Sequence, residues 1–124
     1  EAAEALGLAT GQIAKSVIFR RWADVAALLV VAAGDKRVDE KKVAGLVGPI
    51  GRADAEFVKA KTGYSIGGVA PLGHATPPVT LIDRELFRFG EVWAAAGLPN
   101  GVFRLAPADL ERLTGAPVAD VVQA

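Results

Sequence analysis

Cysteine and methionine are absent from this chain, and histidine occurs only once. The lack of cysteine excludes disulfides, thiolate metal sites and a cysteine nucleophile. A lone histidine cannot supply a cluster of nitrogen ligands, so we expect neither a metal nor another cofactor. The missing cysteines are also compatible with a reducing compartment, and we expect a cytoplasmic protein.

Long hydrophobic runs and an excess of charge of one sign are missing as well. The longest apolar stretch, Val25 to Ala33, is about half of the roughly 20 residues that a membrane-spanning helix needs. We therefore expect a soluble protein that has no membrane partner. Fourteen basic and fourteen acidic residues cancel, so net charge does not indicate nucleic acid, although a local patch could still bind a short single-stranded end.

The chain is long enough for one domain with a real core. Its 124 residues, 52% of them hydrophobic, predict a single domain over residues 1–124. No secretion signal is visible, and the chain begins at Glu1 instead of a methionine, so we expect that an N-terminal portion is missing. The sequence fits a monomer and a homodimer equally.

Short strands and helices alternate along the chain without repeats. Aliphatic and β-branched runs predict strands at residues 13–20, 25–33, 78–82, 91–95 and 101–105, and a closing segment at 118–122. The first two strands, joined by a short polar connection, are typical of a hairpin. Residues 1–8 are expected to be the end of a helix.

Capping residues mark the other helices. Asp39 begins a helix that has Val43, Leu46 and Val47 on one face and ends at Gly48-Pro49. Asp54 begins another helix, which carries Phe57 and Val58 and ends at Gly63, and Asp83 opens a helical stub through Phe87. Pro107 lies in the first turn of a last helix, with Leu110 and Leu113 inward. Strands joined by short connections and interrupted by single helices favour an α/β protein of the α+β type, with a mixed, mostly antiparallel sheet and peripheral helices. Neither glycine-rich nucleotide-binding motif occurs, which disfavours nucleotide-cofactor folds.

One segment is unusually rich in glycine. Residues 62–74 contain four glycines, one proline and the only histidine. Glycine permits positive φ angles and close backbone approach, and proline stiffens the resulting shape. The segment is either a rigid loop whose main chain recognises a ligand or two consecutive turns.

A lysine interrupts the apolar face of the first strand. Alternation places Lys15 on one face with Val17 and Phe19, and Ser16 on the other. Lys15 is either a charge that protects an edge strand, with its apolar stem packed, or a functional group. Ser16 points away from Lys15, and we expect a structural role for it unless a bulge changes its direction.

These residues occur in ordered blocks that cover nearly the whole chain. The blocks are Ile13-Ala14-Lys15-Ser16, residues 34–43, Thr62-Gly63-Tyr64, residues 67–73, Asp83, the Gly97 loop and residues 106–110. Together they resemble the YbaK and prolyl-tRNA synthetase-associated editing domain family. The resemblance implies a YbaK-like fold and an enzyme that hydrolyses amino acids wrongly attached to tRNA, commonly tRNA for proline. Members are free-standing proteins or domains inserted in the synthetase.

The resemblance also implies site residues. It assigns catalysis to Lys15, Gly67 and Gly68, and substrate binding to the rest of the loop through Val69, Ala70 and Pro71. It places Asp83 near the pocket, although Asp83 by its position most simply caps the following turn. Phe19, Ile66 and Val69 are candidates for the wall that reads the amino-acid side chain, with ordinary core packing as the alternative. For His74, we favour a position at the pocket rim or a structural role over general-base catalysis.

Ester hydrolysis makes modest demands on such a site. The enzyme must position a water, hold the terminal adenosine and stabilise the oxyanion that forms on the carbonyl. As a general base, Lys15 would need its pKa lowered from about 10.4 to near 7, at a cost of about 4 kcal/mol. We therefore prefer a protonated Lys15 that stabilises charge, with main-chain groups of the loop and with Pro71 holding the loop in one shape.

We therefore expect a deacylase that acts in trans on mischarged tRNA for translation fidelity, with prolyl-tRNA synthetase as a further partner. The alternative is a non-catalytic module that binds aminoacylated ends or a synthetase; a general esterase is disfavoured because no nucleophile elbow or metal is present. Alanine, serine, threonine, cysteine and small unnatural amino acids all remain candidate cargoes. A basic cluster, Lys36, Arg37, Lys41 and Lys42, could contact tRNA phosphates, but the solvated face of a helix is the commoner explanation.

Overall fold

The computed structural model describes residues 10–65, 69–76, 78–96 and 101–123. The helix expected at residues 1–8 lies outside the described residues, and so do Ile66, Gly67 and Gly68 of the glycine-rich loop.

A long antiparallel hairpin forms the centre of the sheet. After the 3-10 turn η1 (Thr10–Gln12), β1 (Ile13–Arg21) pairs with β2 (Ala26–Ala33) in a register that sets Lys15 opposite Ala32. β2 is entirely apolar, and every residue after its first is buried, because the chain covers both of its faces. The predicted hairpin is confirmed.

Two aspartates begin the helices that follow. The Asp39 carboxylate accepts two main-chain N–H bonds at the start of α2 (Glu40–Val47), and Asp54 accepts one at the start of α3 (Ala55–Thr62). These bonds satisfy donors that have no partner within the first helical turn. Both helices end at the predicted glycines.

The segment around α2 also differs from the sequence prediction. Patterning missed β3 (Ile50–Arg52), which pairs with Phe19–Arg21 at the end of β1. The inward position expected for Leu46 is wrong, since this side chain is 56% exposed. The helix contributes the buried Val43 and the partly buried Val47 to the core, whereas Leu46 does not pack there.

The C-terminal half contains the remaining elements. They are β4 (Val79–Asp83), the 3-10 helix η2 (Arg84–Arg88), β5 (Val92–Ala95), β6 (Val102–Leu105), α4 (Pro107–Thr114) and β7 (Val118–Ala119). These elements match the predicted strands, stub and helix, with boundaries shifted by a few residues. Leu110 is fully buried as predicted, whereas the inward position expected for Leu113 is wrong, because its side chain is 50% exposed.

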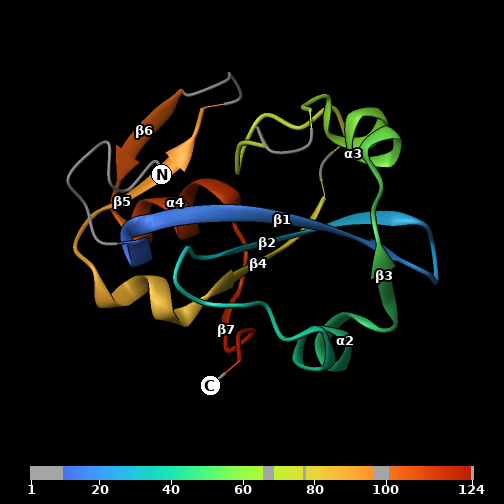
Figure 1. Cartoon of the computed structure of the whole chain (residues 1–124), viewed down its shortest axis with the longest axis horizontal. Coiled ribbons are helices and arrows are strands. Elements are labelled where there is room, and N and C mark those ends of the chain that lie inside the picture. Colours follow the sequence, from blue (N-terminus) through green and yellow to red (C-terminus); the bar gives the residue numbers. More distant parts are fainter. Residues whose placement is uncertain (1–9, 66–68, 77, 97–100, 124) are drawn as a thin grey trace.

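The strands form one mixed sheet in the order β6-β5-β1-β2-β4-β7, with β3 beside β1 (Figure 1). The pairs β1–β2, β1–β3 and β5–β6 are antiparallel, and the pairs β1–β5, β2–β4 and β4–β7 are parallel. Antiparallel pairing dominates the ladders because β1 and β2 alone share eight residue pairs. The predicted mixed α+β fold is confirmed.

A hydrophobic cluster lies on each face of the sheet. The α3-side cluster unites α3, α4, η2 and β5 with one set of β2 side chains, and the α2-side cluster unites α2 and the C-terminal segment with the alternate set. Figure 1 shows α2 and α3 on opposite sides of the central strands. No helix among the described residues has the length and apolar character needed to cross a membrane.

Candidate active site

Lys15 lies on the α2-side face of β1, on the same side as Phe19 of the α2-side cluster. Its ammonium donates a hydrogen bond to the main-chain oxygen of Lys36, which follows β2. Burial is the main reason that the pKa of Lys15 lies below its ordinary value; nearby Arg37 lowers it further, and Asp35 opposes both. Lys15 is thus a partly desolvated amine held in place by a carbonyl.

In the part of the chain that the structure describes, one edge of β1 has no strand beside it next to Lys15. Ile13 and Ala14 pair with β5, and Phe19–Arg21 pair with β3, both on the edge away from β2. Among the described residues, no strand pairs with residues 15–18 on that edge, which we call the open edge. An unpaired strand edge presents main-chain donors and acceptors to whatever lies beside it.

The glycine-rich loop is anchored at both ends. Ala75 N donates to Thr62 O at 2.9 Å, and the Tyr64 hydroxyl donates to Leu72 O at 2.7 Å. Gly73 has a φ of 74°, and a Cβ there would lie 2.8 Å from the Tyr64 hydroxyl oxygen, so this position requires glycine. The described part of the loop therefore has a defined shape, with Val69, Ala70 and Pro71 buried.

The loop packs on the α3-side face of the sheet. Val69 belongs to the α3-side cluster together with Ala94 of β5 and Phe57 of α3, and Tyr64 packs against it. Figure 1 shows the described part of the segment between α3 and β4 on the same side of the central strands as α3. Because Phe19 packs in the other cluster, the structure does not bring Phe19 and Val69 to a common wall. Both side chains pack in the core.

His74 is fixed by the loop itself. Its Nε2 donates to Ala70 O at 2.6 Å, and its ring meets that of Tyr64 edge-on with 5.4 Å between centroids. Nδ1 is buried and has no hydrogen-bond partner among the described residues. This arrangement supports the rim and structural interpretations over general-base catalysis.

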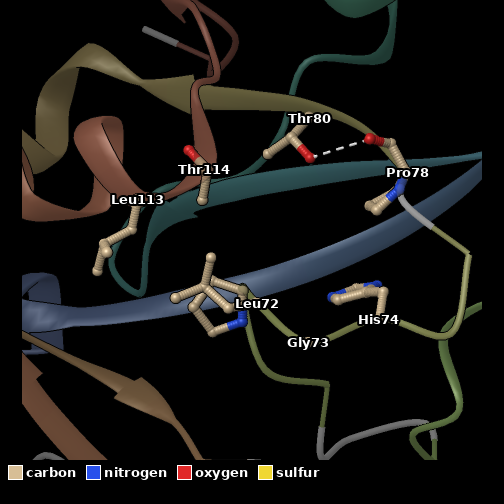
Figure 2. A pocket seen from close by; sticks show the side chains of 8 residues that line it. Leu72, Gly73, His74, Pro78, Thr80, Leu113 and Thr114 are labelled. Atoms are coloured by element: carbon tan, nitrogen blue, oxygen red, sulfur yellow. Dashed lines mark hydrogen bonds between the residues drawn. The ribbon is translucent and has the colours of Figure 1, made fainter.

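A cavity of about 230 Å³ opens beside the loop (Figure 2). Its lining comes from the loop, β4 and α4: Pro71, Leu72, Gly73, His74, Pro78, Thr80, Leu113 and Thr114. This volume is below the roughly 300 Å³ at which drug-sized sites begin, so the cavity suits a small group. Pro71 and His74 were predicted site residues; Thr80, Leu113 and Thr114 were not. The 50% exposure of Leu113 has its explanation here, because the side chain faces the cavity instead of the core.

Asp83 and the basic cluster have structural partners. The Asp83 carboxylate is buried; Oδ2 accepts from Glu85 N at 3.0 Å and Oδ1 from Val121 N at 3.1 Å, which confirms that it caps η2. Two members of the basic cluster form ion pairs, Lys36 with Glu85 and Lys42 with Asp120. These pairs dilute the positive field of the cluster.

Buried polar atoms that lack a partner in the described part of the chain are a feature that the sequence did not reveal. Ser16 Oγ and Arg20 Nε join His74 Nδ1 as buried atoms that lack a hydrogen bond to any described residue. Alternation from Ala14 and Ile18 puts Ser16 and Arg20 on the α3-side face of β1, the face covered by the loop. Buried polar groups are normally satisfied, so these three atoms indicate a place for a ligand or water. The sequence signal that could have shown this is the occurrence of Ser16 and Arg20 on the same strand face as the apolar Ala14 and Ile18.

Comparison with known proteins agrees with this geometry. A family model described as "Aminoacyl-tRNA editing domain" matches residues 1–113. The "Uncharacterized protein YwhH" of Bacillus subtilis is 38% identical over 115 residues, covering 92% of this chain and 73% of that protein. The "Putative Cys-tRNA(Pro)/Cys-tRNA(Cys) deacylase EbsC" of Enterococcus faecalis is 26% identical over 121 residues, covering 96% of this chain and 73% of that protein.

The chain is also similar to proteins of known structure. One described as "a putative trans-editing enzyme for prolyl tRNA synthetase" superimposes with a TM-score of 0.93 at 44% identity, covering 99% of this chain and 78% of that one. The "hypothetical protein APE2540" gives a TM-score of 0.91 at 34% identity, covering 98% of this chain and 81% of that one. Sequence and structure together show that this chain belongs to the aminoacyl-tRNA editing domain family.

Proposed function

We propose that this protein is an aminoacyl-tRNA deacylase that acts in trans on mischarged tRNA, with tRNA for proline as the main substrate. The observation that carries the proposal is the open edge of β1, which has Lys15 at its start and the glycine-rich loop over the other face of the strand. The family supports hydrolysis of an aminoacyl ester, and the two relatives named for deacylation and trans-editing support a tRNA for proline or cysteine. Such a substrate places the protein in the cytoplasm.

The proposed site is the space beside the open edge, next to the unpaired residues 15–18 of β1. The ester of the 3′-terminal adenosine would lie there, with Lys15 on one side and the loop from Gly67 to Pro71 on the other. Water attacks the carbonyl carbon, negative charge develops on the carbonyl oxygen, and the ribose oxygen leaves with a proton from the water. The products are the free amino acid and tRNA with a free ribose hydroxyl.

Lys15 stabilises the developing oxyanion as a cation in this proposal. The hydrogen bond to the Lys36 carbonyl holds the ammonium in position before the substrate arrives, so little reorganisation is needed. Burial strengthens the interaction of this charge with the oxyanion. Gly67 and Gly68 would add main-chain donors, and the cavity beside His74 would receive the small side chain of the amino acid, with Pro71 in its wall.

A panel of charged tRNAs tests the proposal. tRNA for proline and tRNA for cysteine are each charged with alanine, serine, threonine or cysteine and incubated with the full chain, with correctly charged prolyl-tRNA as the control. We expect release of one or a few small amino acids and no release of proline. Binding of the charged tRNAs without release of any amino acid would contradict the deacylase and support a non-catalytic binding module.

A further inference from the structure

The outer end of the β1–β2 hairpin carries an exposed tryptophan with a stacked arginine. Trp22 is 55% exposed, and the Arg20 guanidinium lies 5.6 Å from its ring centroid and 4.6 Å from that of Phe57. The Lys61 ammonium lies 6.0 Å from the Phe57 ring on the same side of the sheet. Arg20, Trp22, Phe57 and Lys61 together are called the Trp22 patch.

The position of the Trp22 ring is defined by its neighbours. A Cβ on Gly51 of β3 would lie 2.5 Å from the indole ring, so the ring rests directly on the bare backbone of that strand. Trp22 N also donates to Pro49 O at 3.1 Å, which fixes the main chain there. A large aromatic side chain is thus held in place while most of it faces solvent. Such a ring is a ready stacking surface.

The cations of the patch are not neutralised. Arg20 and Lys61 form no ion pair with any described residue, and Arg20 Nε has no hydrogen-bond partner there. Acidic neighbours are Asp24, which is paired with Arg21, and Asp54 and Glu56 at the start of α3. An aromatic face flanked by unpaired arginine and lysine matches the chemistry of RNA, which offers base faces and phosphates.

The patch is continuous with the proposed active site. Arg20 and Ser16 lie on the same face of β1, four residues and about 13 Å apart. At the other border, Lys61 O accepts a hydrogen bond from Thr76 N of the loop. An RNA strand whose 3′ end reaches the open edge would therefore pass Arg20 and reach Trp22.

We infer that the Trp22 patch binds the acceptor end of tRNA, with an unpaired base stacked on Trp22 and with phosphates contacted by Arg20 and Lys61. This inference rests on the proposed function for the identity of the RNA. According to this inference, the Trp22 patch contributes to the affinity for tRNA, whereas hydrolysis of the ester takes place at the open edge.

Tryptophan fluorescence reports the stacking directly, because the chain has only two tryptophans, Trp22 and Trp93. The full chain carrying Trp93→Phe is titrated with uncharged tRNA for proline, and the matched Trp22→Phe chain serves as the control. We expect quenching in the Trp93→Phe chain, which retains Trp22, and little change in the control. Equal responses in both chains would overturn the inference.

Affinity gives a second readout. We expect Trp22→Ala to weaken binding of uncharged tRNA about 5- to 150-fold, since stacking of a base on an aromatic side chain contributes about 1 to 3 kcal/mol. Gly51→Ala displaces the ring and should weaken binding in the same direction. Lys61→Ala should lower the salt dependence of binding by about one counterion. Unchanged affinity in folded Trp22→Ala would overturn the inference and leave the surface to a protein partner.

The proposed deacylase activity and the inferred RNA-binding surface can be tested independently. A minimal ester, an amino acid on the ribose of adenosine alone, reaches the proposed active site but is too short to reach Trp22. We expect Trp22→Ala to hydrolyse it as fast as wild type while losing efficiency on charged tRNA. If the wild-type protein hydrolyses neither substrate but Trp22 is quenched by tRNA, the deacylase is contradicted and the RNA surface stands.

Discussion

The pKa of Lys15 depends on burial and on two charges of the turn that follows β2. Arg37 and Asp35 act in opposite directions on the pKa of Lys15, and burial is the larger cause of its decrease. A lysine whose folded pKa lies below its unfolded value makes stability rise with pH through the interval between the two values, because the unfolded chain binds more protons there. Lys15 is therefore kept at some cost in stability, as expected for a functional group.

Removing Arg37 should move this pKa in a known direction. We expect Arg37→Ala to raise the pKa of Lys15, because one of the two causes that lower it is lost. The pKa is read from NMR titration of the Lys15 side chain. Lys41→Ala, an exposed lysine on α2, is the control and should leave the pKa unchanged. A decrease in Arg37→Ala would contradict this description of the site.

A second residue-level prediction concerns the hairpin turn. The hydrogen bond from Arg21 lowers the pKa of Asp24 to about 2. Because this folded pKa is depressed, the pair contributes stability above the ordinary carboxylate pKa and loses it as the pH falls toward about 2. We expect Arg21→Gln to return the Asp24 pKa toward 3.8, measured by the carboxyl carbon shift in NMR. An unchanged low value would mean that the main-chain bond from Ala26 N controls the pKa.

At the scale of the elements, the same turn contains a strained residue. Val25 has a φ of 57°, in the left-handed region that β-branched residues avoid. We expect Val25→Asn to stabilise the protein by about 1 kcal/mol, because asparagine tolerates this conformation and the side chain is largely exposed. The measurement is denaturant unfolding. The control is Ala23→Asn, which lies in the same turn but has no positive φ and should not raise the free energy of unfolding. A lower free energy of unfolding in Val25→Asn would contradict the strain at Val25.

The predicted elements that were confirmed have local signals. The hairpin follows from two β-branched runs with a polar turn, and α2 and α3 follow from aspartate at one end and glycine at the other. β3 has no such signal, since Ile50–Arg52 is three residues long and is a strand only because β1 lies beside it. Helical periodicity likewise could not show that Leu46 and Leu113 are exposed, because each lies near the end of a short helix.

The candidate site was predictable in part. Strand alternation correctly separated Lys15 from Ser16, because it depends only on backbone geometry. It could not show which face of β1 the loop would cover, and so Phe19 and Val69 were expected to form one wall. That choice depends on the packing of Val69 into the α3-side cluster, which also holds residues far from it in the sequence such as Ala14 and Ala94.

At the scale of the whole molecule, the sheet order explains why a site forms at β1. β3 and β5 occupy the two ends of one edge and leave four residues between them without a strand partner in the described part of the chain. The α3-side and α2-side clusters hold the strand rigidly on both faces. The result is an unpaired stretch of main chain in a fixed position, which is a suitable platform for an ester and a water.

The most direct test of this account is the rate of amino-acid release from a mischarged tRNA under single-turnover conditions. Wild type is compared with Lys15→Ala, Lys15→Arg and the control Lys41→Ala, all verified as folded. We expect Lys15→Ala to be at least about 100-fold slower, as for the loss of one group that stabilises an oxyanion. Lys15→Arg should retain part of the rate because it keeps the charge, and Lys41→Ala should match wild type. A Lys15→Ala protein as fast as wild type would contradict the central role given to this lysine.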